Sequence, residues 1–167
     1  MSPLEQLGTF ARYNRWMNER LYEHCARLSD AQRKEDVGAF FKSIHGTLNH
    51  LLLADRVWLG RFTGRPFHAD SLAQELYADF DELRSERATT DDAIDAWVAS
   101  LDLGRLAADL SYTSLSNPAP RRFPLWIAAA HFFNHQTHHR GQVTTLLAQR
   151  GIDPGVTDLL ALPHAAG

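Results

Sequence analysis

The chain has 167 residues, 44% of them hydrophobic, and a formal charge of -3, which predicts one domain over residues 1–167 with a substantial core. The charge is nearly neutral and Lys and Arg form no block, which argues against a duplex DNA binder, because phosphate neutralisation needs clustered cations, and we expect no nucleic-acid partner. Cys25 is the only cysteine, so no disulfide framework exists. No apolar run resembles a secretion signal or a bilayer span, and we expect a cytoplasmic protein with no membrane partner.

Apolar residues at helical spacing predict four long helices, over residues 4–28, 39–63, 80–100 and 125–150. We expect Phe40 in the core stripe of the second helix. The third helix is expected to weaken near residues 88–91 and to turn its charges to solvent as an outer member.

The connections between these helices carry weaker signals. Ser71 is expected to cap a short helix at residues 72–77. Alternation over residues 110–123 predicts either a hairpin or an extended crossover, and residues 159–162 a brief helical cover. Four long helices with one long crossover before the last predict an all-α four-helix bundle, an architecture that builds metal sites from facing helices.

The last predicted helix carries four of the nine histidines within nine residues. Residues four apart lie one above the other on a helix, so His135 and His139 can offer two imidazoles to one point. This face continues through apolar side chains, so it points inward, and Gly141 is expected to let a neighbouring backbone come close. His50, on a small apolar face of the second helix, is the candidate third ligand.

Three imidazoles predict a mononuclear divalent-metal site with open coordination positions. A pair of histidines four apart is by itself a weak signal, which core or surface histidines explain more readily than a metal site. Gln136 stands where a zinc peptidase needs a glutamate base, and the Glu-x-x-His pairs of a di-iron bundle are missing. Imidazole suits zinc, nickel, copper and iron alike, and we expect zinc or nickel.

Two polar residues are further candidates for binding a cofactor. Asn14 lies on the core stripe of the first helix, where its amide either bonds a backbone carbonyl or serves the site. Gln142, nearly one turn beyond His139, can line the same cavity.

The roles of the other polar residues near the histidine-rich stretch, residues 131–142, are open. His131 suits either a hydrogen bond to a ligand or a buried filler, and His138 is expected at the surface. Arg140 either pairs with an acid such as Asp158 or stays solvated. The role of His45 is open, and the histidines expected at the surface elsewhere are His24, His68 and His164.

Two blocks, residues 43–58 and 134–142, resemble the DinB family of bacterial four-helix bundles, and residues 13–16 and 154–160 extend the match over essentially the whole chain. The resemblance implies an up-down-down-up bundle, commonly a homodimer, with one divalent metal on His50, His135 and His139. Some relatives carry a glutamate where this chain has His135, so the preferred metal need not be shared.

The resemblance also implies an activity. Its better-understood relatives are metal-dependent isomerases and S-transferases that use a low-molecular-weight thiol, which the metal holds as a thiolate and directs at an electrophilic substrate. Two alternatives remain: a metal-dependent hydrolase acting through water, and a non-catalytic, metal-stabilised damage- or stress-response protein.

Overall fold

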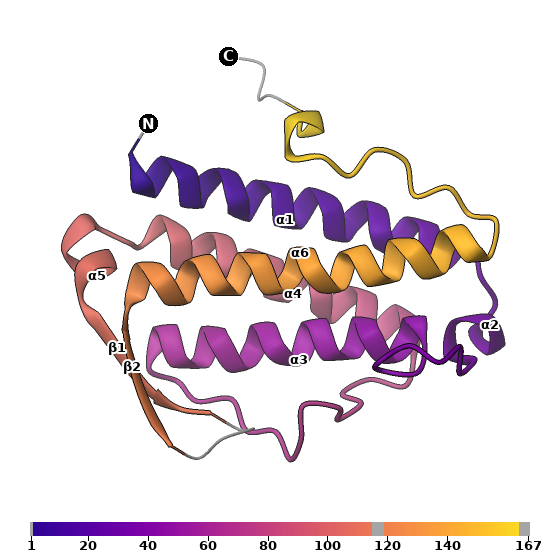
Figure 1. The fold of residues 1–167 in the computed structure, drawn as a ribbon, viewed down its shortest axis with the longest axis horizontal. Coiled ribbons are helices and arrows are strands. Elements are labelled where there is room, and N and C mark those ends of the chain that lie inside the picture. The colour runs from indigo at the N-terminus through magenta and orange to yellow at the C-terminus, as the bar shows by residue number, and fades with distance from the viewer. Residues whose placement is uncertain (1, 115–118, 164–167) are drawn as a thin grey trace.

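The computed structural model describes residues 2–114 and 119–163. Four long helices form a bundle, which confirms the all-α prediction (Figure 1). They are α1 (Pro3–Ala26), α3 (Ile44–Thr63), α4 (Phe80–Ala99) and α6 (Leu125–Gln149). Three short helices, α2 (Asp30–Lys34), α5 (Leu103–Ala107) and the 3-10 turn η1 (Leu159–Ala161), lie outside it.

The four long helices have the up-down-down-up order. In Figure 1, α1 and α6 run one way and α3 and α4 the other. Helices α1 and α3 each contact both α4 and α6. The connection over residues 64–79 joins two parallel helices and therefore runs the length of the bundle, while the long connection before α6 holds α5 and a hairpin.

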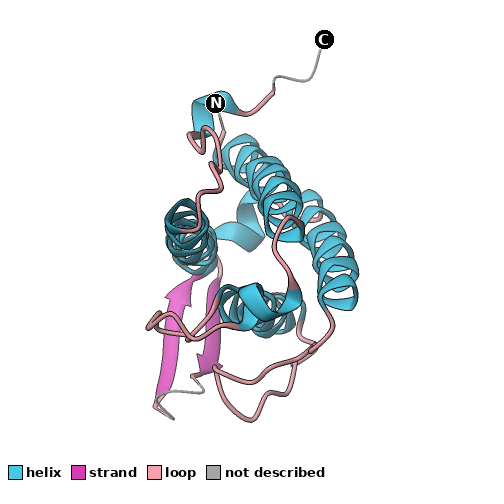
Figure 2. Cartoon of the chain, turned by 90° about the vertical axis from the view of Figure 1, so that its right-hand side faces the viewer, coloured by secondary structure: helices cyan, strands magenta, loops and turns pink. Residues whose placement is uncertain are grey.

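Of the two alternatives predicted for residues 110–123, a hairpin or an extended crossover, the structure has the hairpin. Strand β1 (Asp109–Thr113) pairs antiparallel with β2 (Pro120–Pro124), with Leu110 opposite Phe123. The strands contact α3 and α6 and cover that side of the bundle (Figure 2). The hairpin thus forms a wall beside the groove between these two helices.

Local chemistry fixes where the long helices begin and end. Ser2 and Glu5 form a reciprocal capping box at the start of α1. Ser43 accepts a hydrogen bond from the Gly46 amide at the start of α3, which ends at Gly64 with φ of 70°. The second long helix therefore begins at residue 44, five residues later than predicted, because residues 39–42 form a turn closed by an Ala39–Lys42 bridge.

The prediction for Phe40 was wrong, since its side chain is 84% exposed in this turn. The helix predicted at residues 72–77 is also absent. The amide oxygen of Asn49 accepts hydrogen bonds from the backbone of Leu76 and Tyr77, at 2.8 and 3.0 Å. His45 Nε2 and Asn49 Nδ2 contact the Tyr77 carbonyl at 2.9 and 3.0 Å. Side chains from α3 thus occupy the backbone groups that a helix would have paired.

The core is divided into two apolar clusters by a layer of polar side chains. One cluster gathers around Trp58, Phe62 and Phe132, and the other around Leu48, Leu83 and Leu147. Between them lie buried charged and amide side chains from all four long helices: Asn14, Asn18, Asp55, Arg87, Asp91, Gln136 and Arg140.

This polar layer corrects the prediction for the third long helix. Helix α4 is unbroken over Phe80–Ala99, and Thr89 and Thr90 return their hydroxyls to carbonyls one turn earlier instead of starting a new turn. Its charges are not all solvated, since Arg87 and Asp91 are 3% exposed. Arg87 pairs with Asp91 at 2.8 Å and with Asp55 of α3 at 2.5 Å.

Within the described residues, no helix has both the length and the apolar character needed to cross a membrane.

Candidate metal centre

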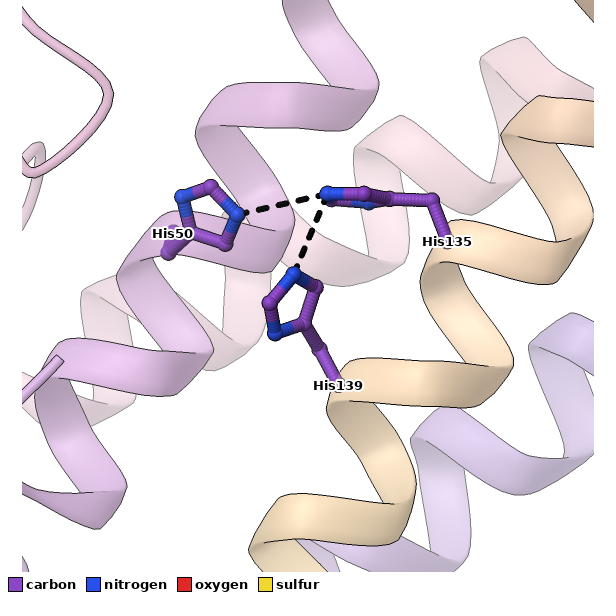
Figure 3. Close-up of side chains that lie close together, drawn as sticks. All are labelled: His50, His135 and His139. Atoms are coloured by element: carbon purple, nitrogen blue, oxygen red, sulfur yellow. Dashed lines mark hydrogen bonds between the residues drawn. The ribbon is translucent and has the colours of Figure 1, made fainter. Parts of the chain in front are cut away.

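His50, His135 and His139 bring their rings together in the groove between α3 and α6 (Figure 3). The Nε2 atom of His135 lies 3.4 Å from that of His50 and 3.1 Å from that of His139. His50 and His139 are buried, and His135 is half-buried. Three imidazoles from two helices are therefore positioned to hold one metal ion.

The spacing of these nitrogens fits a metal ion better than it fits a hydrogen-bonded cluster. Two ligand nitrogens in a tetrahedral zinc site lie about 3.3 Å apart, given Zn–N distances of about 2.0–2.1 Å. Three facing nitrogens without a metal would leave lone pairs opposed in a desolvated groove, which is unfavourable.

Hydrogen bonds on the far side of two rings orient them. His50 Nδ1 lies 2.8 Å from the carbonyl oxygen of Leu72, and His139 Nδ1 lies 2.7 Å from Gln142 Oε1. A carbonyl oxygen can only accept, so each Nδ1 carries the proton and each Nε2 presents its lone pair to the common point. This arrangement is typical of metal-binding histidines.

The protonation state of the three rings also favours metal binding. Burial lowers the pKa of His50 to about 4 and that of His135 to about 3, and the neighbouring rings add to the effect for both. Burial also lowers the pKa of His139, which Gln142 partly opposes. The rings are therefore neutral at neutral pH, so protons compete little with a metal for their nitrogens.

Phe41 covers the outer side of the triad. Its ring stacks on His50, with centroids 3.8 Å apart, and meets His139 edge-on at 5.5 Å. Gly46 makes this possible, because a Cβ atom there would lie 2.2 Å from the Phe41 carbonyl oxygen. The tight turn before α3 is therefore part of the site.

A pocket of about 260 Å³ opens beside the triad and is bounded by α3, α6 and β1. His50 and His135 line it, and Trp58, Tyr112 and His131 contribute aromatic walls. A larger cavity of about 640 Å³ lies between α1 and α6, but no triad histidine lines it. The smaller pocket is therefore the space next to the metal centre.

The structure places the two polar cofactor candidates differently. Gln142 contacts His139 directly. Asn14 is fully buried in the polar layer, where its amide accepts a hydrogen bond from Arg140 and donates to Asp91 at 3.2 Å. Its partners are thus charged side chains rather than a backbone carbonyl or a ligand in the pocket.

Several other expectations for the histidine-rich stretch need correction. Arg140 is neither paired with an acid nor solvated, since it is 3% exposed and bonds Asn14. His131 is exposed rather than a buried filler, and its ring lies 5.1 Å from that of Trp58. Nothing approaches within 4 Å of a Cβ added at Gly141, so the expected close backbone contact occurs at Gly46 instead.

The remaining histidines are placed as follows. His138 and His68 are exposed as expected, and His24 is half-buried. His45 is buried and supports the loop after α3 through Tyr77. His164 lies outside the described residues.

The whole chain is similar to a known protein family. A model of the DinB family matches residues 1–167, the whole chain. The chain belongs to the DinB family. Protein DinB of Bacillus subtilis (strain 168) is 25% identical over 154 residues, covering 87% of each chain. The resemblance of the sequence blocks to this family is therefore confirmed.

Some residues that shape this DinB-family site could not be predicted from the sequence. Phe41 and Leu72 act through a turn and a backbone carbonyl, which leave no pattern in a sequence. Asp55 did carry a signal, because it is a lone carboxylate within the apolar run of α3. It accepts a hydrogen bond from Gln136 at 2.8 Å and so connects α3 to α6 beside the triad.

Proposed function

We propose that this protein is a metal-dependent enzyme of the thiol S-transferase or isomerase type, with zinc or nickel on His50, His135 and His139. The observation that carries the proposal is the convergence of three Nε2 atoms, two with their Nδ1 protons already engaged, beside an open pocket. A divalent metal bound there supplies a positive charge that lowers the pKa of a coordinated thiol.

The thiol comes from outside the chain. Cys25 is the only cysteine, it is buried in the apolar cluster of α1 and α3, and burial raises its pKa to about 12. A thiol in that state is no nucleophile at neutral pH. His131, an imidazole outside the triad that lines the same pocket, is placed to take up the proton of an incoming thiol.

A hydrolase is the less favoured alternative. Water needs more help in losing a proton than a thiol does, and hydrolytic metal sites of helical proteins use a glutamate for this. The described residues that line the pocket include no carboxylate. A purely structural metal is disfavoured because the triad meets a pocket instead of being enclosed by a fourth protein ligand within the described chain.

The metal content of the purified protein tests the site. We expect about one zinc or nickel per chain by elemental analysis, and loss of that metal in His135→Ala. His138→Ala is the matched control, since this exposed histidine lies on the same helix outside the triad. Equal metal content in His135→Ala and the parent would show that the assignment is wrong.

The binding of thiols tests the chemistry. In cobalt-substituted protein, a small thiol is expected to enter the coordination sphere and change the visible absorption spectrum. A spectrum unchanged at saturating thiol would favour the non-catalytic alternative.

The proposal extends to the location, the oligomeric state and the partners of the protein. We propose a cytoplasmic homodimer that acts on a small electrophile, with no nucleic-acid or membrane partner. Sedimentation of the purified protein tests the dimer.

A further inference from the structure

Arg61 occupies an unusual position in the pocket beside the triad. Its guanidinium carbon lies 4.5 Å from the ring centroid of Trp58 and 4.4 Å from that of Tyr112. The cation therefore lies against two aromatic rings, one from α3 and one from β1, which meet each other edge-on at a wall of the pocket.

Arg61 has little to occupy its hydrogen-bond donors. Within the part of the chain that the structure describes, its one hydrogen bond is long, 3.4 Å from Nη2 to the Thr113 carbonyl oxygen. No carboxylate lies within ion-pair distance of it in residues 2–114 or 119–163. Other arginines of the bundle differ, since Arg87 and Arg56 pair with Asp55 and Glu86. Arg61 is half-buried, and burial lowers its pKa, which marks a charge that protein groups do not compensate.

The charged side chains that line the pocket are all positive. Arg121 from β2 also lines it, and the described lining holds two arginines and no acid, although the whole chain carries -3. The rings of Trp58 and Tyr112 present apolar faces between the arginine and the histidines. Such a pocket suits an elongated molecule with an apolar middle and one anionic end.

We propose that Arg61 binds a carboxylate at the end of the thiol cofactor or substrate that is remote from the reacting sulfur. The inference rests on the proposed function, because the other end of the molecule is at the metal. A guanidinium packed against these two rings still has hydrogen-bond donors to offer, and its fork of donors matches a carboxylate through two parallel hydrogen bonds. His50 and Arg61 are eleven residues apart on α3, roughly 16 Å of helix rise between their backbones. The Arg61 side chain packs on Trp58, one turn nearer to His50, so the ligand spans only part of that distance.

A series of thiols that differ in length and in end group tests this directly. Cobalt-loaded protein is titrated with ω-mercaptoalkanoic acids and with the matching ω-mercaptoalcohols, and binding is followed by the thiolate-to-cobalt absorption. Below a certain length the acids should have no advantage. Once the chain reaches Arg61, we expect the acid to bind about tenfold more tightly than the alcohol.

Variants assign that advantage to one side chain. Arg61→Met keeps the aliphatic packing on Trp58 and removes the charge, so acid and alcohol should bind equally. Arg84→Met is the matched control, because Arg84 is exposed on α4, which does not line the pocket. Elemental analysis should find the metal content of all three proteins equal, since Arg61 contacts no histidine of the triad.

The outcomes separate the two proposals. If thiols bind but acids never exceed alcohols, or if the acid advantage survives in Arg61→Met, the role of Arg61 is overturned and the metal-thiol function stands. If no thiol changes the cobalt spectrum, the proposed function itself fails, and this inference with it.

Discussion

Single side chains set the orientation of the ligands in this site. His139 is held by Gln142 on the same helix, three residues along, at 2.7 Å. A ring with a fixed Nδ1 proton must point Nε2 at the common centre, whereas a free ring can rotate or change tautomer. Gln142, which orients the ring, therefore matters nearly as much for metal binding as His139 itself.

Gln142→Leu removes this acceptor and leaves the three histidines in place. We expect the affinity for zinc to fall about 10–100-fold, because the ring of His139 loses its orientation. The measurement is a competition titration of zinc against a chromophoric chelator. Gln149→Leu, an exposed position at the end of the same helix, is the control and should match the parent. An unchanged affinity in Gln142→Leu would mean that packing against Phe41 alone orients His139.

At the scale of elements, the turn before α3 is the part that fits the helix to the site. Ser43 caps α3 at Gly46, and the Phe41 carbonyl lies where a Cβ of residue 46 would be. Phe41 covers His50 only while the turn stays in this place. A change at the start of α3 would therefore move the turn, and with it the ring that packs on His50.

Gly46→Ala tests this link. The added methyl must push the turn away, and we expect the metal-free protein to lose about 1–3 kcal/mol of unfolding free energy in urea. Gly141→Ala is the contrasting control, because its Cβ meets nothing within 4 Å and alanine favours a helix, so stability should rise by up to about 1 kcal/mol. Equal behaviour of the two variants would contradict the close approach seen at Gly46.

At the scale of the whole molecule, the polar layer connects all four long helices. Arg87 of α4 pairs with Asp55 of α3, Gln136 of α6 donates to the same carboxylate, and Asn18 of α1 donates to Asp91. Burial would lower the pKa of Arg87, but the two carboxylates outweigh it and raise the pKa above its ordinary value. Because hydrogen bonds are directional, such a layer fixes the register of the helices against one another, which apolar packing does less strictly.

Arg87→Leu should therefore be severe. It leaves Asp55 and Asp91 buried without their cation, and we expect a loss of about 3–5 kcal/mol in urea unfolding. Arg122→Leu makes the same substitution in the exposed pair with Asp109 on the hairpin and should change stability little. If Arg87→Leu unfolded at the same urea concentration as Arg122→Leu, the layer would not be holding the bundle together.

The four long helices and the ligand candidates could be predicted from the sequence, because both depend on local spacing. Helical periodicity marks the buried faces, and a four-residue separation must place His135 above His139. His50 could be named because an imidazole on a small apolar helix face is unusual. The family blocks added the order of the helices.

The surroundings of those ligand candidates become visible only when the helices are packed. Arg87 and Asp91 have the four-residue spacing of a solvated helix pair, and nothing local shows that another helix covers them. Residues 72–77 have helical propensity, but Asn49 and His45 take their backbone groups. Hydrogen bonds and buried charges join residues far apart in the chain, so their partners appear only when the helices are packed.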